Sequence, residues 1–323
     1  MDLFARPDNP IPEGAETFTV RAQDGVRLRC AFWPATAAPA AGSVLLLQGR
    51  AEMIEKYFET VSDLRARGFS VLTFDWRGQG GSDRLLADRR KGHVGDFADY
   101  EADLRAVLES ELAARCEQPW FCLAHSMGAC VALSVAHRGA LPVKRLIAIA
   151  PMLAIHRIAN PAGVLWLSRM LRRVGLGGRY IPGGGPVSIA TKPYPGNPLT
   201  ADAARYARNS GFASQFPDLA IGDPTIGWTR AAFTRMAEMS QSSYAGVIRT
   251  PTLVLCAGDE RVVSTPAGEL FASRLGEGGG VTFANARHEL LMETDAVRAQ
   301  VFAGFDAFVS GKAPAELASE PRS

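Results

Sequence analysis

The chain has 323 residues, of which 47% are hydrophobic and 21% are charged. This composition predicts a folded protein with one large core or two modest ones, and it argues against disorder. Thirty-five Lys and Arg against 33 Asp and Glu leave a formal net charge of +2. Because dedicated nucleic-acid binders concentrate basic residues, we expect no DNA or RNA partner.

The N-terminal residues lack the basic stretch and apolar segment of a secretory signal. No uncharged apolar run reaches the roughly 18 residues that a membrane-spanning helix needs. The sequence therefore predicts a cytoplasmic protein that does not span a membrane.

Neither a metal nor an organic cofactor is expected. The five cysteines are odd in number and form no C-x-x-C pair, so we expect reduced core residues. His288 and Glu289 lack the second His of a zinc-binding H-E-x-x-H helix, because Met292 stands at that place. No complete G-x-G-x-x-G or G-K-[ST] nucleotide motif follows a predicted strand.

The predicted elements alternate between strands and helices. An antiparallel pair is expected at 17–20 and 26–33 around the turn Asp24-Gly25, followed by short buried strands. These strands fall at 43–47, 70–74, 120–123 and 146–150, separated by helical patterns near 54–67, 97–114 and 127–138. The order predicts an α/β fold with a mostly parallel sheet and right-handed crossovers.

The sequence pattern changes from residue 151 to 247, where Gly and Pro interrupt short helical patterns. We expect an inserted cap subdomain at 151–247, with a core formed by 1–150 and 248–310 and a flexible tail at 311–323. The core pattern resumes with strands at 252–256 and 281–283 and helices at 266–275 and 297–309.

A serine stands where the strand 120–123 meets the helix 127–138, in Ala124-His125-Ser126-Met127-Gly128. A nucleophilic serine on such a sharp turn needs small residues two positions before and after it, and Ala124 and Gly128 meet that need. The Met127 amide, at the helix N-terminus, then points to where an oxyanion would form.

A serine hydroxyl needs a base and an orienting acid before it becomes a good nucleophile. His288 follows the strand 281–283 and precedes the last helix, a place from which a base could reach the serine. Asp259 follows the strand 252–256 and is the predicted acid. Other candidates are Asp218, Asp223 and Asp295, which fit solvated or capping roles better.

A second oxyanion donor is expected just after the strand 43–47, in Gln48-Gly49-Arg50-Ala51, and the Arg50 amide is the candidate. The alternative is that Gly49 only turns the chain.

Six ordered motifs resemble the α/β-hydrolases of the lysophospholipase and monoacylglycerol lipase type (serine aminopeptidase S33-like). They are 48–52 with Tyr57, 74–82, 97–100 with Asp103, the serine turn, 258–259 with 262–263, and 286–289. The resemblance implies an α/β-hydrolase fold with nucleophile, acid and base at Ser126, Asp259 and His288. It places the oxyanion amides at Arg50 and Met127.

The chain departs from the family pattern where Gln48 replaces a usual His, Arg50 a small or apolar residue, and Ala124 a Gly. We expect Gln48, Gly49, Arg50 and His125 to contact substrate.

Acidic residues are absent between Gln118 and Thr200, whereas nine basic residues occur there. Beside them, 164–167 and 170–171 form an apolar helical stretch typical of a helix that rests on an anionic membrane. A lid helix with an apolar inner face and solvated arginines is equally compatible with this pattern. The protein could therefore be peripheral at the inner face of the membrane.

The sequence thus predicts a serine hydrolase that cleaves a monoacyl lipid through an acyl-enzyme, with lysophospholipid as the leading substrate. The alternatives are a monoacylglycerol lipase, a small-molecule carboxylesterase or thioesterase, acyl transfer to an alcohol, and a non-catalytic ligand binder on the same fold.

Overall fold

A computed structural model describes residues 2–311, and its centre is an eight-stranded sheet with the order β1-β2-β4-β3-β5-β6-β7-β8. The strands are β1 (Glu16–Arg21), β2 (Arg27–Trp33), β3 (Gly42–Leu47), β4 (Phe69–Phe74), β5 (Trp120–His125), β6 (Arg145–Ile149), β7 (Thr252–Ala257) and β8 (Gly278–Phe283). The pairs β1–β2 and β2–β4 are antiparallel, and all other pairs are parallel. The antiparallel entry and the parallel core predicted from the sequence are confirmed.

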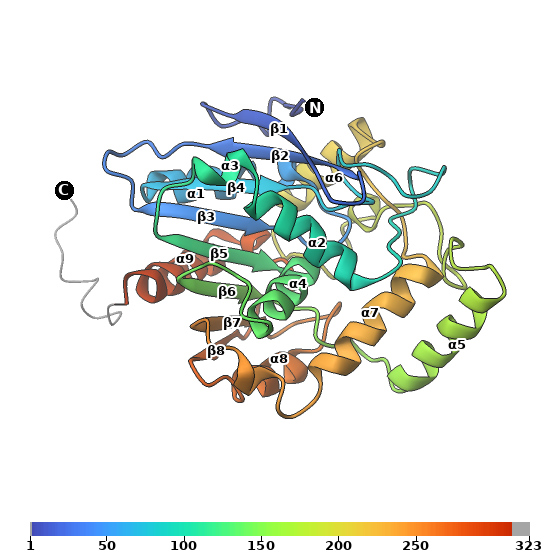
Figure 1. The fold of residues 1–323 in the computed structure, drawn as a ribbon. Helices are drawn as coiled ribbons and strands as arrows, with labels where there is room; N and C mark the ends of the chain where they lie inside the picture. The colour runs from blue at the N-terminus through green and yellow to red at the C-terminus, as the bar shows by residue number, and fades with distance from the viewer. Residues whose placement is uncertain (1, 312–323) are drawn as a thin grey trace.

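Helices cover both faces of this sheet (Figure 1). They are α1 (Phe58–Ala66), α2 (Phe97–Leu108), α3 (Glu111–Ala114), α4 (Ser126–His137), α8 (Thr265–Ala272) and α9 (Asp295–Ser310), with short 3-10 turns at Ile54–Tyr57 and Leu290–Met292. Figure 1 shows α2 and α4 in front of the strands and α9 behind them.

The central strands are continuous apolar runs because both of their faces are covered. Every residue of β3 and of β4 is buried. The N-terminal hairpin joins this core through β2, whose Trp33 is fully buried and donates its indole N–H to the Pro12 carbonyl at 3.0 Å.

The segment from residue 150 to 251, between β6 and β7, adds no strand to the sheet. It contains α5 (Pro161–Arg173), α6 (Ala203–Gln215) and α7 (Ile226–Met239) and two short 3-10 turns (Ile189–Thr191 and Ala245–Val247). Figure 1 shows α5 and α7 extending beyond the carboxyl ends of the central strands. The segment therefore lies over the edge of the sheet where the predicted serine stands.

The last helix of this segment packs into the core against α2 and α4. Trp228, Phe233, Met236 and Met239 of α7 belong to the main hydrophobic core together with the central strands. A parallel connection from β6 to β7 requires a crossover helix, and α7 fills that place. We propose that the cap ends before α7, earlier than residue 247. The predicted tail falls outside the described residues from 312 onward.

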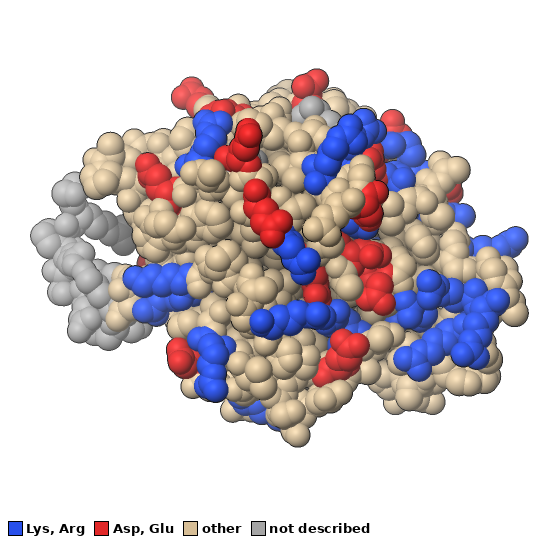
Figure 2. Space-filling model, in the orientation of Figure 1, with Lys and Arg blue, Asp and Glu red and all other residues tan. Residues whose placement is uncertain are grey.

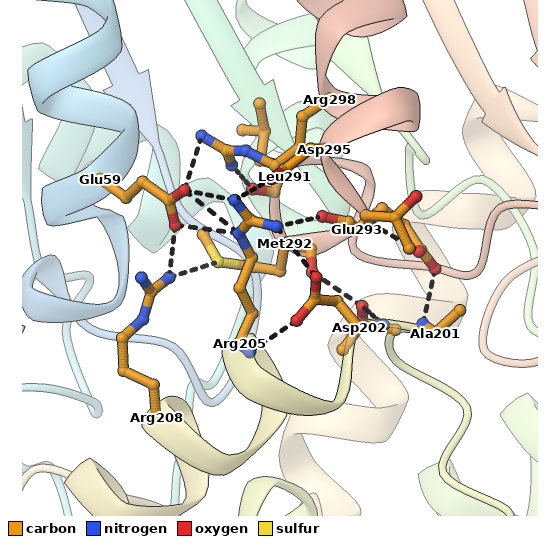
Figure 3. Close-up of polar contacts among 12 residues, drawn as sticks. Glu59, Ala201, Asp202, Arg205, Arg208, Leu291, Met292, Glu293, Asp295 and Arg298 are labelled. Atoms are coloured by element: carbon orange, nitrogen blue, oxygen red, sulfur yellow. Dashed lines mark hydrogen bonds and ion pairs between the residues drawn. The ribbon is translucent and has the colours of Figure 1, made fainter. Parts of the chain in front are cut away.

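Helix α6 is tied to the core by a network of ion pairs (Figure 3). Arg205 lies at its centre and binds Glu59 of α1 at 2.5 Å, Asp295 of α9 at 2.7 Å and Asp202 at 3.0 Å. The Arg205 guanidinium also donates to the Glu293 carbonyl at 3.0 Å. Three elements distant in sequence are thereby held at one point.

Glu59 receives more than one guanidinium in this network. Arg208 of α6 contacts Glu59 at 2.8 Å, and Arg298 of α9 contacts it at 3.6 Å. Burial opposes the charge on Glu59, but the hydrogen bond from Arg205 and the nearby Arg298 and Arg208 outweigh it and lower its pKa to about 2. Glu59 is therefore ionised over the whole neutral and mildly acidic range.

Among residues 2–311, no helix combines the length and the apolar character that crossing a bilayer would require.

The substitution Arg205→Met should destabilise the fold by about 2 kcal/mol near neutral pH, because it removes the central cation from the partly buried carboxylates of Glu59 and Asp202. A carboxyl group with a lowered folded-state pKa stabilises the protein above its ordinary pKa, and this stability is lost as the pH falls toward the folded-state value. The difference from wild type should therefore shrink between about pH 5 and pH 3.

Urea denaturation at several pH values measures this difference. Arg89→Met is the matched control, because the Arg89 side chain is exposed. Equal free energies of unfolding for the two variants would contradict a stabilising role of the network.

Candidate active site

The predicted serine stands on a strained turn between β5 and α4. Ser126 has a φ of 51°, a left-handed conformation that non-glycine residues rarely adopt. It is the first residue of α4, directly after the last residue of β5. Strain of this kind persists only where the surrounding structure holds it in place, and it exposes the hydroxyl at the sheet edge.

The small residue after the serine is required by the backbone of β3. A β-carbon placed on Gly128 would lie 2.4 Å from the Gln48 carbonyl oxygen and 2.9 Å from that of Leu47. These neighbours are main-chain atoms, which cannot rotate away as a side chain can. The start of α4 therefore packs directly against the end of β3.

His288 contacts both the serine and a carboxylate. Its Nε2 lies 3.0 Å from Ser126 Oγ, and its Nδ1 lies 2.8 Å from Glu260 Oε2. All three side chains are buried or nearly so. The geometry is that of a nucleophile, a base and an orienting acid in line.

The carboxylate that contacts His288 belongs to Glu260. The predicted contact between Asp259 and His288 is therefore wrong. The Asp259 side chain is 41% exposed, and it is bound by Arg261 at 2.9 Å and by Arg287 at 3.5 Å. The backbone explains the difference, because the Asp259 amide donates to the Ala286 carbonyl and places this residue on the outer side of the loop. The next residue then turns inward toward the histidine.

Backbone amides fix the inward carboxylate. Glu260 Oε1 accepts hydrogen bonds from the amides of Arg261, Val262 and Val263 at 2.9, 2.8 and 3.3 Å. Burial would raise the pKa of Glu260, but His288 and these amides more than offset it, so the pKa lies below its usual range. An ionised carboxylate at this place can accept the His288 Nδ1–H. In the sequence, Glu260 directly follows Asp259 and lies two residues before Val262, so chain order alone did not separate the two acids.

The residues that carry the two predicted oxyanion amides follow the carboxyl ends of two neighbouring strands. Arg50 follows the end of β3, and Met127 is the second residue of α4, directly after β5. In the parallel register of these strands, Leu47 of β3 pairs with Ala124 of β5. Both amides therefore lie at the sheet edge that carries Ser126, and their role as oxyanion donors stays a prediction.

A buried carboxylate lies behind the serine and joins the surrounding loops. Glu52 accepts hydrogen bonds from the Gly49 amide and from the Tyr57 hydroxyl, the latter at 2.7 Å. Its other oxygen binds Lys56 at 2.8 Å. Burial opposes its charge, but Lys56 and His125 hold the pKa of Glu52 well below its ordinary range.

His125 joins this carboxylate to the backbone of the base. Its Nδ1 lies 3.2 Å from Glu52 Oε2, and its Nε2 lies 3.2 Å from the His288 carbonyl oxygen. Burial lowers the pKa of His125, but the Glu52 carboxylate outweighs burial and raises it overall. The His125 ring thus connects Glu52 with the backbone of His288.

A cavity opens above Ser126 and His288. Its walls are mainly apolar side chains from the core and from the segment 150–251: Met53, Met152, Ile155, Ile189, Leu199 and Phe212. Charged side chains also reach it, among them Arg50, Lys56 and Glu289. An apolar cavity with a few polar groups beside a nucleophile suits an amphiphilic ligand.

Of the four residues predicted to contact substrate, only Arg50 lines this cavity. Gln48 is fully buried, and its carbonyl accepts the Trp76 indole N–H at 2.9 Å. A β-carbon on Gly49 would lie 3.0 Å from His125 Nδ1, so these two residues pack against each other behind the serine. Gln48, Gly49 and His125 do not line this cavity, and their contact with substrate stays a prediction.

Comparisons with known proteins find hydrolases. A family model described as serine aminopeptidase, S33 matches residues 38–295. Lysophospholipase L2 of Escherichia coli strain K12 is 35% identical over 270 residues, which cover 79% of this chain and 76% of that protein. A probable lysophospholipase L2 of Haemophilus influenzae is 28% identical over 267 residues, or 83% of each chain.

Solved structures share the fold. A soluble variant of monoglyceride lipase from Saccharomyces cerevisiae superposes with a TM-score of 0.71 at 20% identity and covers 92% of this chain and 96% of that one. A carboxyl esterase from Bacillus coagulans has a TM-score of 0.74 at 16% identity, with 93% and 99% covered.

Substituting the two adjacent acids should separate their roles. Glu260→Gln should slow the labelling of Ser126 by a fluorophosphonate on the order of 10³-fold, because an amide no longer stabilises the charged imidazole. Asp259→Asn should keep the rate within about 3-fold, because its carboxylate faces Arg261 and solvent. Stopped labelling reactions resolved on a gel give both rates.

Ser126→Ala is the control for labelling at other residues, and thermal unfolding confirms that each variant is folded. A large loss with Asp259→Asn and a small one with Glu260→Gln would reverse the assignment.

Proposed function

The chain belongs to the serine aminopeptidase S33 family of α/β-hydrolases, and from this premise we propose that it hydrolyses the ester bond of a lysophospholipid. It is a serine ester hydrolase with an α/β-hydrolase fold. The line from Glu260 through His288 to Ser126, at the floor of an apolar cavity, is the observation that carries the proposal.

The proposed reaction begins with Ser126 Oγ attacking the ester carbonyl carbon. His288 Nε2, at 3.0 Å, takes the hydroxyl proton as the new C–O bond forms. Glu260 accepts the Nδ1–H and stabilises the imidazolium that results. The amides of Arg50 and Met127 are the proposed donors to the oxyanion, a contribution typically worth about 3 kcal/mol for each donor.

Collapse of this intermediate breaks the ester C–O bond. His288 returns the proton to the leaving alcohol, and the acyl group stays on Ser126. Water then attacks the acyl-enzyme while the same histidine takes its proton, which releases the fatty acid and restores the serine.

The cavity supports a substrate with one acyl chain. Its apolar walls suit a hydrocarbon chain, and its charged groups suit a polar head. Neutral monoacylglycerol is the second candidate, because a structural neighbour is a monoglyceride lipase. The charge of Arg50 in the cavity wall favours the phospholipid.

Fatty-acid release from lysophosphatidylcholine should depend on Ser126. The variant Ser126→Ala should lose activity on the order of 10⁵-fold, because no other nucleophile replaces the hydroxyl. A matched monoacylglycerol of the same chain length, assayed in parallel, ranks the two head groups by kcat/KM.

Equal release by wild type and Ser126→Ala would contradict the serine mechanism. Labelling of Ser126 without release from either lipid would retain the esterase and reject the lipid substrate.

We also infer that the outer face of α5 rests on an anionic membrane. Helix α5 packs against α7 on its inner side, and no residue of α5 lines the cavity among the described residues. Its outer side exposes Trp166 by 64% and Leu167 by 46%, and Val174 at its end is 70% exposed. Apolar side chains on an outward helix face are typical of helices that lie in a lipid interface.

Basic residues accompany this apolar face. Arg169, Arg172 and Arg173 are exposed on the same helix, and Figure 2 shows Lys and Arg gathered over the region of α5. Six of the eleven large hydrophobic side chains that are exposed in the described part of the chain lie between residues 158 and 194. Apolar exposure and positive charge together fit an anionic lipid surface.

Neutralising Arg169, Arg172 and Arg173 to Gln should weaken binding to phosphatidylglycerol vesicles on the order of 100-fold at low salt, since each cation contributes roughly 1 kcal/mol. Trp166→Ser should also weaken it. Sedimentation with vesicles of phosphatidylglycerol or of phosphatidylcholine alone measures the binding.

Leu270→Ser is the matched control, because Leu270 is 51% exposed on α8, outside this surface. Equal binding to both kinds of vesicle, or an unchanged affinity of the triple variant, would contradict the membrane contact.

A further inference from the structure

The side chain of Arg50 occupies a specific place in the cavity wall. Its Nη2 donates to the Gly222 carbonyl at 2.9 Å. Its guanidinium carbon lies 5.0 Å from the centre of the Trp228 ring on α7. The aromatic face and the carbonyl fix the guanidinium, so Arg50 is held in place before any ligand arrives.

In the described part of the chain Arg50 has no counter-ion, unlike the buried Arg29, Arg77 and Arg235. Arg29 binds Glu55, Arg77 binds Asp103, and Arg235 binds Glu101. Within residues 2–311, Arg50 has no such ion pair, and its buried Nε has no hydrogen-bond partner. The guanidinium has five N–H donors, and its partners in the protein are one carbonyl and one aromatic ring.

The charge of Arg50 persists in this place. Burial lowers its pKa to about 10, which leaves the guanidinium protonated near neutral pH. The other acids of the cavity are engaged elsewhere, since Glu52 and Glu289 both bind Lys56 and Asp223 accepts the Gly185 amide at 3.0 Å. Arg50 therefore forms no ion pair with the described residues of the cavity, although the nearby Asp223 carboxylate favours its charge.

The proposed oxyanion donor and this cation belong to the same residue, which places the charge near the reacting ester. The amide of Arg50 is the proposed oxyanion donor, so the ester carbonyl lies at the backbone of the same residue whose side chain carries the charge. In a lysophospholipid the three carbons of glycerol separate the ester from the phosphate. The Arg50 side chain and a glycerol unit have comparable lengths. The phosphate of a substrate bound in this way would therefore lie close to the Arg50 guanidinium.

We propose that the Arg50 side chain binds the phosphate of the substrate head group and thereby selects monoacyl phospholipids over neutral glycerides. The proposal rests on the ester hydrolysis proposed above and adds the head-group specificity. A guanidinium fork matches two phosphate oxygens, and such charge-assisted bonds are about twice as strong as neutral ones.

The test compares Arg50→Gln with wild type on two soluble short-chain substrates, a lysophosphatidylglycerol and a monoacylglycerol with the same acyl chain. The ratio of their kcat/KM values should fall about 10- to 100-fold in the variant, because one charge-assisted contact is lost for the phospholipid alone. Arg50→Lys should recover part of the ratio, since it keeps the charge and loses the fork. Arg179→Gln, an exposed arginine outside the cavity, is the matched control.

Glycerol 3-phosphate provides a second readout that does not depend on lipid turnover. It should inhibit monoacylglycerol hydrolysis by wild type competitively and at lower concentration than glycerol does, and this difference should disappear in Arg50→Gln.

Each failure has its own signature. An unchanged ratio in Arg50→Gln, or an equal fall on both substrates, would overturn the phosphate contact while leaving the hydrolase assignment intact. Wild-type activity on the monoacylglycerol alone would overturn both the contact and the lysophospholipid substrate. No activity on either substrate would instead overturn the proposed function itself.

Discussion

The buried carboxylate of Glu52 is the interaction on which the candidate active site depends. It joins the loop after β3, through the Gly49 amide, to the end of β5, through His125. Lys56 extends the connection from Glu52 to Glu289, which directly follows His288. A charge of this kind is tolerated only when cations and hydrogen bonds surround it. The oxyanion loop, the end of β5 that carries the nucleophile, and the segment of the base are therefore positioned by one ionised group.

Much of this arrangement could be predicted from the sequence, because it follows from strand order. The short apolar runs predicted the sheet, and the residues at their carboxyl ends predicted Ser126 and His288. Chain order could not choose between Asp259 and Glu260, because adjacent residues point in different directions and the choice depends on a backbone contact with Ala286. The contacts of Gln48 and His125 could not be predicted either, because their partners, Trp76 and His288, lie far away in the chain.

The segment between β6 and β7 is attached to the core in two different ways. Helix α6 is held by ion pairs with α1 and α9, and its Tyr206 and Phe212 line the cavity. Helix α5 instead packs on α7 and presents its other side to solvent. Polar anchoring thus fixes the helix that shapes the cavity, while apolar packing on a neighbouring helix leaves α5 free to expose hydrophobic side chains. The two helices of one segment therefore serve different surfaces.

The contact between Gly128 and the carbonyls of β3 restricts how this active site can evolve. A larger residue at position 128 meets main-chain atoms of Leu47 and Gln48, so no second substitution nearby can make room for it. Position 124 differs, because Ala124 already carries a β-carbon within the sheet. Sequence drift and laboratory libraries should consequently accept Ala as well as Gly at position 124 and reject any side chain at position 128.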